Sequence, residues 1–311
     1  MLTVARILCP TDFSDASQHA LEQAIVIAGF FSARVTVLHV YNQVFLPVPG
    51  LAMPSIGGEL ASGQVEAAQL QEQAEAFAAP ARAAGLTVEV VVEPGLPIQH
   101  VLARAKQEAV DLIVMGTHGT SGFEHLMLGS VTEKVLRKAT CPVLTVPPRV
   151  HGASSVPFKH ILCAIDFSES SIAALAAALS LAQEADAELT LMHVLDWPIH
   201  DTPPAAMPGG ADRSTATPVF DLEGYRRVLE ADAVDRLQRL VPADARSWCS
   251  PATMVVHGKP HVEVLKAAAE RQADLIVLGV RGRNTFDLML FGSTTNQIVR
   301  QANRPVLTVH A

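Results

Sequence analysis

The fold of this chain is indicated most clearly by the stretch DLIVMGTHGTSGFEHLMLGS, residues 111–130, and by its counterpart DLIVLGVRGRNTFDLMLFGS, residues 274–293. In each stretch an apolar run leads into two glycines three residues apart, then nine further residues and a Gly-Ser pair. The sequence after each Gly-Ser pair has apolar residues at helical spacing. A strand–loop–helix pattern that occurs twice predicts two copies of one domain.

The rest of the chain aligns in the same two copies. RILCPTDFSDAS at 6–17 matches HILCAIDFSESS at 160–171 with an offset of 154, whereas the glycine stretches match with an offset of 163. The second copy is therefore nine residues longer, between its second and third expected strands. We expect one domain over residues 1–147, a proline-flanked linker over 148–157 and a second domain over 158–311.

Each copy alternates between short apolar runs and amphipathic stretches. In the first copy the β-branched apolar runs lie at 4–9, 35–40, 88–92, 111–115 and 143–146. Strands that are apolar throughout and separated by helices are typical of a parallel sheet covered on both faces. The expected fold class is therefore α/β, with two tandem doubly wound domains of five strands each. Ser14 and Ser168 are expected to be the N-caps of the first helix of each copy.

Composition and charge exclude several classes of function. A net charge of −8 argues against nonspecific nucleic-acid binding, which needs basic faces. The N-terminus does not resemble a signal peptide, and the longest uncharged Ala/Leu segment is too short to cross a bilayer, so we expect a cytoplasmic protein with no membrane partner. The four cysteines form no CxxC pair and have no zinc-ligand spacing, so we expect no metal site. We expect the cysteines to be buried, structural thiols instead.

The glycine stretches predict a binding site at the carboxyl ends of the strands, where parallel α/β sheets hold their ligands. Gly116 and Gly119 follow a strand, and they permit a close approach to a ligand or a positive φ. Ser130 lies at the start of a helix, where free N–H groups favour an anion. The alternative is a tight turn followed by a serine that caps its helix. Because the second copy repeats the pattern, we favour anion binding.

Charged and polar residues beside the glycines extend this prediction. Asp12 and Asp166 follow the first strand of each copy, where a carboxylate suits a ribose hydroxyl or a base N–H; alternatively, each binds its own loop backbone. His118 either hydrogen-bonds a phosphate or is a loop histidine with no role in binding. Arg281 and Arg283 either offset phosphate charge or are simply solvated.

Other features limit the kind of site. Neither GxxxxGK[ST] nor GxGxxG occurs, which argues against P-loop hydrolysis and against a dinucleotide dehydrogenase. His39 and His193 end matched strands and are expected to be structural. The segments 41–63 and 195–220 are rich in Pro and Gly and are expected to be long loops, either lids or plain crossovers.

Together these motifs resemble the universal stress protein family in its tandem form. The family signature G-x2-G-x9-G-[ST] is met twice, and ILCPTDFS, VTVLHV and CPVLTV also resemble the family. The resemblance implies strand order 3-2-1-4-5 and ATP, with Mg²⁺, bound where strands 1 and 4 diverge. It also implies an internal pseudo-dimer through the two fifth strands, and it allows a homodimer.

The resemblance also implies site residues, by position in this sequence. In the first copy they include the adenine-side residues, the ribose and phosphate path and the phosphate cradle: Pro10, Thr11, Asp12, Val40, Met115, Gly116, His118, Gly119, Gly129, Ser130, Val131 and Thr132. In the second copy they are Asp166, Val194, Leu278, Gly279, Arg281, Gly282, Gly292, Ser293, Thr294 and Thr295. Because Ala164 and Ile165 replace Pro10 and Thr11, the first site is favoured over the second, and Gly116→Ala is expected to weaken binding more than Gly279→Ala.

Three functions are compatible with these residues. The leading hypothesis is an ATP-binding stress-response regulatory protein with little or no hydrolysis. The second is a weak ATPase or nucleotidyl-transfer enzyme, for which only Asp12 or His118 offers an acid or base. The third is a module whose Pro/Gly loops bind a partner or a small ligand rather than a nucleotide.

Overall fold

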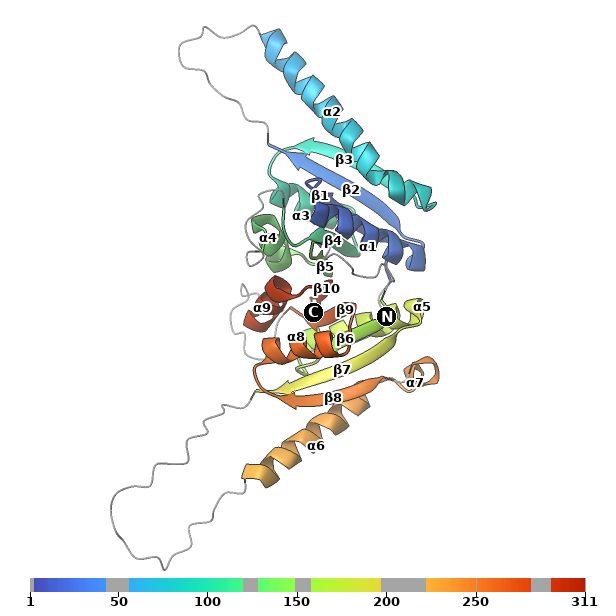
Figure 1. The fold of residues 1–311 in the computed structure, drawn as a ribbon. Helices are drawn as coiled ribbons and strands as arrows, with labels where there is room; N and C mark the ends of the chain where they lie inside the picture. Colours follow the sequence, from blue (N-terminus) through green and yellow to red (C-terminus); the bar gives the residue numbers. More distant parts are fainter. Residues whose placement is uncertain are drawn as a thin grey trace, which may run out of the picture.

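The two copies form two α/β units that share one sheet (Figure 1). The computed structural model describes residues 3–42, 56–119, 128–148, 158–196, 222–249, 251–280 and 292–310. The first copy consists of β1 (Arg6–Thr11), α1 (Asp15–Phe31), β2 (Arg34–Tyr41), α2 (Ile56–Ala83), β3 (Val88–Pro94), α3 (Pro97–Gln107), β4 (Leu112–Gly116), α4 (Ser130–Lys138) and β5 (Val143–Val146). The second consists of β6 (His160–Ala164), α5 (Glu169–Ala185), β7 (Glu188–Leu195), α6 (Leu222–Leu240), α7 (Ala245–Trp248), β8 (Ala252–His257), α8 (Pro260–Glu270), β9 (Leu275–Gly279), α9 (Ser293–Gln301) and β10 (Val306–Val309).

The sheet has ten strands in the order β3-β2-β1-β4-β5-β10-β9-β6-β7-β8. Within each copy the strands are parallel and follow the order 3-2-1-4-5, which confirms the expected fold class. The copies join through β5 and β10, which pair antiparallel with Leu144 opposite Leu307. Two buried hydroxyls reinforce this seam, because Thr145 Oγ1 donates to Val306 O at 3.2 Å and Thr308 Oγ1 donates to Val143 O at 3.1 Å.

This seam is the internal pairing of fifth strands that the resemblance implied. Pairing of the two strands leaves neither edge open for a second chain, and an unpaired apolar edge is an aggregation hazard that such pairing removes. The ends of the ten-stranded sheet are β3 and β8. Association of two chains into a homodimer stays a prediction.

Each face of the sheet carries one hydrophobic core that runs through both copies. One core takes its helical residues from α1, α2, α5, α6 and α7, and the other from α3, α4, α8 and α9. The strand residues alternate between the two, so that Ile7 belongs to the first core and Leu8 to the second. A sheet covered on both faces explains why the strand runs are apolar throughout instead of alternating with polar residues.

Most local predictions hold, with one correction. Ser14 and Ser168 are N-caps, since each side chain accepts a hydrogen bond from the backbone N–H three residues on. Residues 56–63, expected to be loop, form the start of α2. Glycines there suggested a turn, but the Ala-, Glu- and Gln-rich run that follows favours helix propagation. The rest of the segments 41–63 and 195–220 falls largely outside the described residues, so their role as lids stays a prediction.

The four cysteines are buried and unpaired, as expected of structural thiols. Burial raises the pKa of the Cys9 thiol to about 12 and that of Cys141 to about 11. Among the described residues, no helix combines the length and the apolar character needed to cross a membrane.

Candidate functional site

A cleft opens in the first copy at the carboxyl ends of β1, β2 and β4. All twelve residues that the resemblance implied in the first copy line this one cavity, whose volume is about 200 Å³. They come from the end of β1, from β2, from the end of β4 with its following loop, and from the first turn of α4. The sheet edge where β1 and β4 diverge therefore gathers residues that lie more than a hundred positions apart in the chain.

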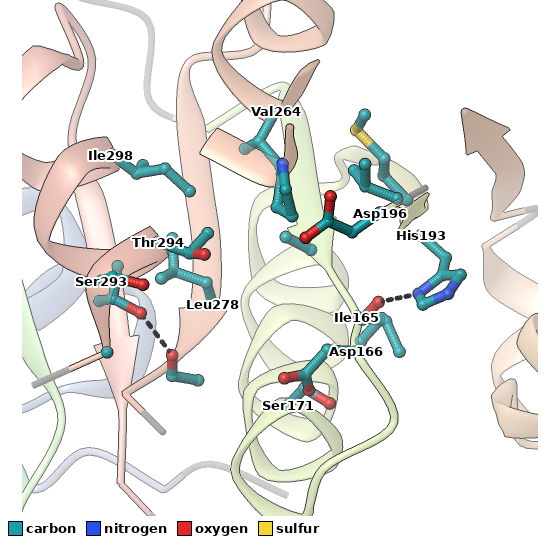
Figure 2. Close-up of a pocket in the computed structure, with 17 residues that line it drawn as sticks. Ile165, Asp166, Ser171, His193, Asp196, Val264, Leu278, Ser293, Thr294 and Ile298 are labelled. Carbon is teal, nitrogen blue, oxygen red and sulfur yellow. Dashed lines mark hydrogen bonds between the residues drawn. The ribbon is translucent and has the colours of Figure 1, made fainter. Parts of the chain in front are cut away.

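The second copy has the equivalent cleft, with a volume of about 390 Å³ (Figure 2). Its lining includes the implied residues Asp166, Val194, Leu278, Gly279, Gly292, Ser293, Thr294 and Thr295. The candidates Arg281, Gly282 and Arg283 lie outside the described residues.

Backbone contacts fix the helix start against the strand end in both clefts. Thr132 Oγ1 donates to Gly116 O at 2.8 Å, and the Gly129 N–H donates to Thr117 O at 2.8 Å. In the second copy Thr295 Oγ1 donates to Gly279 O at 3.0 Å, and the Gly292 N–H donates to Val280 O at 3.2 Å. The threonine two positions after each Gly-Ser pair thus holds the helix N-terminus beside the strand.

In the part of the chain that the structure describes, no side chain caps either of these helix N-termini. Ser130 and Ser293 are the first residues of α4 and α9, and the N-cap position before each is a glycine, which supplies no side-chain acceptor. The expected alternative, in which Ser130 caps its helix, is therefore wrong. First-turn N–H groups that lack an intrahelical partner, together with the helix dipole, favour an anion at this point.

The glycines of the motif serve close packing more than unusual backbone angles. Among the described residues, the glycines with positive φ are Gly85, Gly95 and Gly258, so neither Gly116 nor Gly119 adopts the positive φ that glycine permits. A Cβ on Gly116 would lie 2.9 Å from Ala16 Cβ, in the first turn of α1. A Cβ on Gly279 would lie 2.6 Å from the backbone carbon of Ser170. The first glycine of each motif therefore lets the strand end approach the neighbouring helix.

Asp12 faces Gly119 across the first cleft. A Cβ on Gly119 would clash with Asp12 Oδ2, so a larger residue there would require the carboxylate to move. Asp12 Oδ1 accepts hydrogen bonds from the Ser14 N–H at 3.1 Å and the Ser14 hydroxyl at 2.6 Å. Asp166 binds Ser168 in the same way, at 3.0 and 2.5 Å. Each aspartate thus holds its own loop, as the structural alternative expected, while it also lines a cleft.

The aspartate loops are held in a conformation that side chains rarely adopt. Phe13 and Phe167, which follow the two aspartates, have φ of 62° and 63°. His39 braces the first loop, because its Nδ1 donates to Thr11 O at 2.9 Å and its ring stacks on Phe13 at 4.3 Å. His193 Nδ1 donates to Ile165 O at 2.6 Å, so both histidines have the structural role that the sequence predicts. Strain of this kind persists where the surroundings enforce it, as in binding sites.

The replacement of Thr11 by Ile165 in the second copy removes fewer potential ligand contacts from the second cleft than the sequence comparison suggests. Thr11 Oγ1 donates to Ser17 Oγ at 3.1 Å and accepts the Phe13 N–H at 3.0 Å. This hydroxyl is buried and already occupied within the loop. Its loss therefore removes a brace and not a group aimed at a ligand.

Sequence reasoning missed an apolar wall in each cleft. Leu38, Pro97 and Val101 line the first cavity, and Met192, Pro260 and Val264 line the second. The two prolines begin α3 and α8, and they match at the same offset of 163 as the glycines, a signal that identifies the wall in retrospect. An apolar slot beside a helix N-terminus suits a flat ring attached to an anionic group.

Charge in the two clefts is uneven. No lysine or arginine occurs among the described residues that line either cavity. The first turn of α4 contains Glu133, whose Oε2 lies 3.4 Å from Arg300 Nη2, whereas the first turn of α9 contains no acidic residue. Thr294 also adds a hydroxyl where the first cleft has Val131. For an anion, these features at the helix start favour the second cleft, whereas Asp196, which lines only the second cavity, opposes this.

The fold and the paired clefts define a doubly wound α/β protein with two candidate ligand sites, each at the carboxyl ends of its own copy's strands. A model of the universal stress protein family matches residues 3–147 and 157–310, so the chain belongs to that family, in tandem form. A universal stress protein of Mycolicibacterium smegmatis is 27% identical over 309 residues, which cover 97% of this chain and 96% of the relative. A single-copy relative, MJ0531 of Methanocaldococcus jannaschii, is 35% identical over 144 residues, 45% of this chain and 81% of the relative.

Solved structures show the same architecture. The crystal structure of a universal stress protein from Archaeoglobus fulgidus matches with a TM-score of 0.66 and 25% identity, and the match covers 98% of each chain. A putative universal stress protein from Pseudomonas aeruginosa, at 17% identity, shares the fold with a TM-score of 0.62.

Proposed function

We propose that this protein is a nucleotide-binding regulatory protein, with ATP as the ligand of the first cleft and a second purine nucleotide in the other. The observation that carries this proposal is the pair of glycine-capped helix N-termini, each beside an apolar slot and an aspartate loop. The N–H groups of α4 or α9 would hold phosphates, the slot would take the base, and Asp12 or Asp166 would accept a hydrogen bond from ribose or base.

The same residues favour retention of the nucleotide over turnover. Asp12 Oδ1 accepts from Ser14, and His118 Nδ1 pairs with Thr117 Oγ1 at 2.8 Å, so the two candidate acid–base groups are engaged within the protein. Among the described residues no group of three or more His, Cys, Asp or Glu side chains is placed to hold a metal ion. Mg²⁺ would therefore arrive with the nucleotide, coordinated chiefly by its phosphates.

Mass spectrometry of nucleotide released from freshly purified protein tests the proposal, with the number of nucleotides per chain as the readout. We expect bound adenine nucleotide, and a rise in the unfolding temperature when Mg-ATP is added. Protein without nucleotide that also fails to respond to Mg-ATP would contradict it.

One observation keeps an enzymatic alternative open, because Asp12 and His118 line the same cavity. Steady-state ATP hydrolysis measured for the wild type, Asp12→Asn and His118→Gln separates the two functions. Regulatory binding predicts negligible turnover in all three proteins. An ATPase predicts turnover that either substitution abolishes.

A further inference from the structure

The two clefts differ at the end of the second strand of each copy. Asp196 follows β7 and lines the second cavity. Its counterpart at the offset of 154 is Asn42, which follows β2 and is not among the residues that line the first cavity. The second cleft therefore has an additional, solvent-exposed carboxylate, in the larger of the two cavities.

This carboxylate lies away from the expected phosphate end. Figure 2 shows Ser293 and Thr294 on one side of the cavity and Asp196 across from them, with its carboxylate directed toward the cavity, which Val264 also lines. Val264 belongs to the apolar slot that would take the base. A base in this slot, with its phosphates at the start of α9, would present its edge toward Asp196.

The chemistry of a carboxylate distinguishes between purines. An ionised carboxylate only accepts hydrogen bonds, and two parallel N–H donors match its two oxygens. The Watson–Crick edge of guanine offers two adjacent N–H donors, at N1 and at the 2-amino group. Adenine offers only its 6-amino group there, and its N1 is an acceptor that a carboxylate repels. Asp166 does not discriminate between the clefts, because Asp12 occupies the same position in the first.

We propose that the second cleft prefers a guanine nucleotide over an adenine nucleotide, and that Asp196 is the residue that selects it. The inference rests on the proposed function, since it assumes that the cleft binds a nucleotide. It assigns different bases to the two clefts of one chain.

Photocrosslinking tests each cleft separately in the full chain. The protein is labelled with 8-azido-ATP or 8-azido-GTP in competition with unlabelled ATP or GTP, and the labelled peptides are assigned by mass to the first or second copy. We expect GTP to protect the second copy at lower concentration than ATP, and the reverse order for the first copy. Asp196→Asn, which introduces the residue of the first copy, should reduce the preference of the second cleft for GTP by about tenfold, as expected for loss of hydrogen bonds to a charged group.

Asn42→Asp is the matched control, because it adds the same charge at the equivalent position outside the cavity lining. It should leave the second cleft's preference unchanged. The inference is overturned if the two clefts rank GTP and ATP alike, if Asp196→Asn leaves the ranking intact, or if Asn42→Asp changes it as much as Asp196→Asn does. A protein that neither nucleotide protects in either copy would instead refute nucleotide binding itself.

Discussion

Adding a methyl group at the first glycine of each motif should destabilise the protein, and more in the second copy than in the first. In Gly279→Ala the new Cβ would lie 2.6 Å from both the backbone carbon and the Oγ of Ser170, and 2.7 Å from the Ser171 nitrogen. In Gly116→Ala the corresponding contacts are 2.9 Å to Ala16 Cβ, 3.0 Å to the Ala16 carbon and 3.1 Å to the Ser17 nitrogen. Ordinary contacts begin near 3.4 Å, so the overlap is about 0.8 Å in the second copy and about 0.5 Å in the first.

The obstructing atoms are mostly backbone atoms of α1 and α5, which rotation of a side chain cannot move. Overpacking of this kind costs about 1–3 kcal/mol. We place Gly279→Ala near the upper end of that range and Gly116→Ala near the lower. For domains of this size each kcal/mol lowers the unfolding temperature by roughly 2–4 °C.

Differential scanning calorimetry of ligand-free protein measures the effect, with Gly29→Ala as the control. Gly29 lies within α1 and a Cβ there meets no atom within 4 Å, so alanine should stabilise the helix by about 0.5–1 kcal/mol. Variants at Gly116 and Gly279 that unfold at the wild-type temperature, or a larger loss at Gly116, would refute the packing argument. Nucleotide affinity measured on the same variants then tests separately whether Gly116→Ala weakens binding more, as the sequence comparison predicts.

Three further outcomes are expected. All four thiols should resist an aromatic disulfide reagent at about pH 8 until the protein unfolds, because burial raises their pKa values and little thiolate is exposed; prompt modification of any thiol would contradict this. Thr308→Val should lower the free energy of unfolding in urea by about 0.5–1.5 kcal/mol, since it removes the hydrogen bond to Val143 O across the seam, and an unchanged midpoint would show that this bond contributes nothing. A hydrogen bond from His100 lowers the pKa of Glu93 below its usual value; partial burial opposes this shift, and Arg104 adds to it. Ionised Glu93 therefore stabilises the fold above its unfolded-state pKa of about 4.3, and this stabilisation is lost as the pH falls through the lower folded-state pKa. Glu93→Gln should flatten the acid side of the profile of unfolding free energy against pH, measured between about pH 6 and pH 3.

Repetition made much of the fold and of the site predictable from the sequence. The two glycine stretches at one offset indicated strand, loop and helix, and the first-copy residues implied by the family motif all line one cavity. What the sequence could not show was which neighbour each residue touches. Gly116 suggests a ligand or a turn, whereas its Cβ direction faces α1, and Thr11 suggests a ligand contact although its hydroxyl is bonded within its own loop.

The correction at residues 56–63 has a different physical origin. Glycine and serine lower the helix propensity locally, but a helix extends cooperatively from a strong segment into a weaker one. A composition window over those few residues cannot register the Ala-, Glu- and Gln-rich run that follows them. The apolar wall around Pro97 was missed for a related reason, since its residues come from separate elements and share no local pattern.

Fusion of the two copies in one chain explains why their clefts differ. In a symmetric dimer of identical chains, every contact between residues i and j at the seam is matched by one between j and i, and both clefts must be the same. Here Glu133 in α4 pairs with Arg300 in α9, while the counterparts of these residues at the offset of 163 are Asn296 and Arg137. The acid is therefore present on one side of the pseudo-twofold axis only. Because the two copies are separate stretches of one chain, their clefts need not be alike: the first has Thr11 and Val131 where the second has Ile165 and Thr294, and Asp196 lines only the second cavity. The residues that distinguish the clefts line the cavities, whereas the paired strands β5 and β10 that join the copies have the same sequence, VLTV.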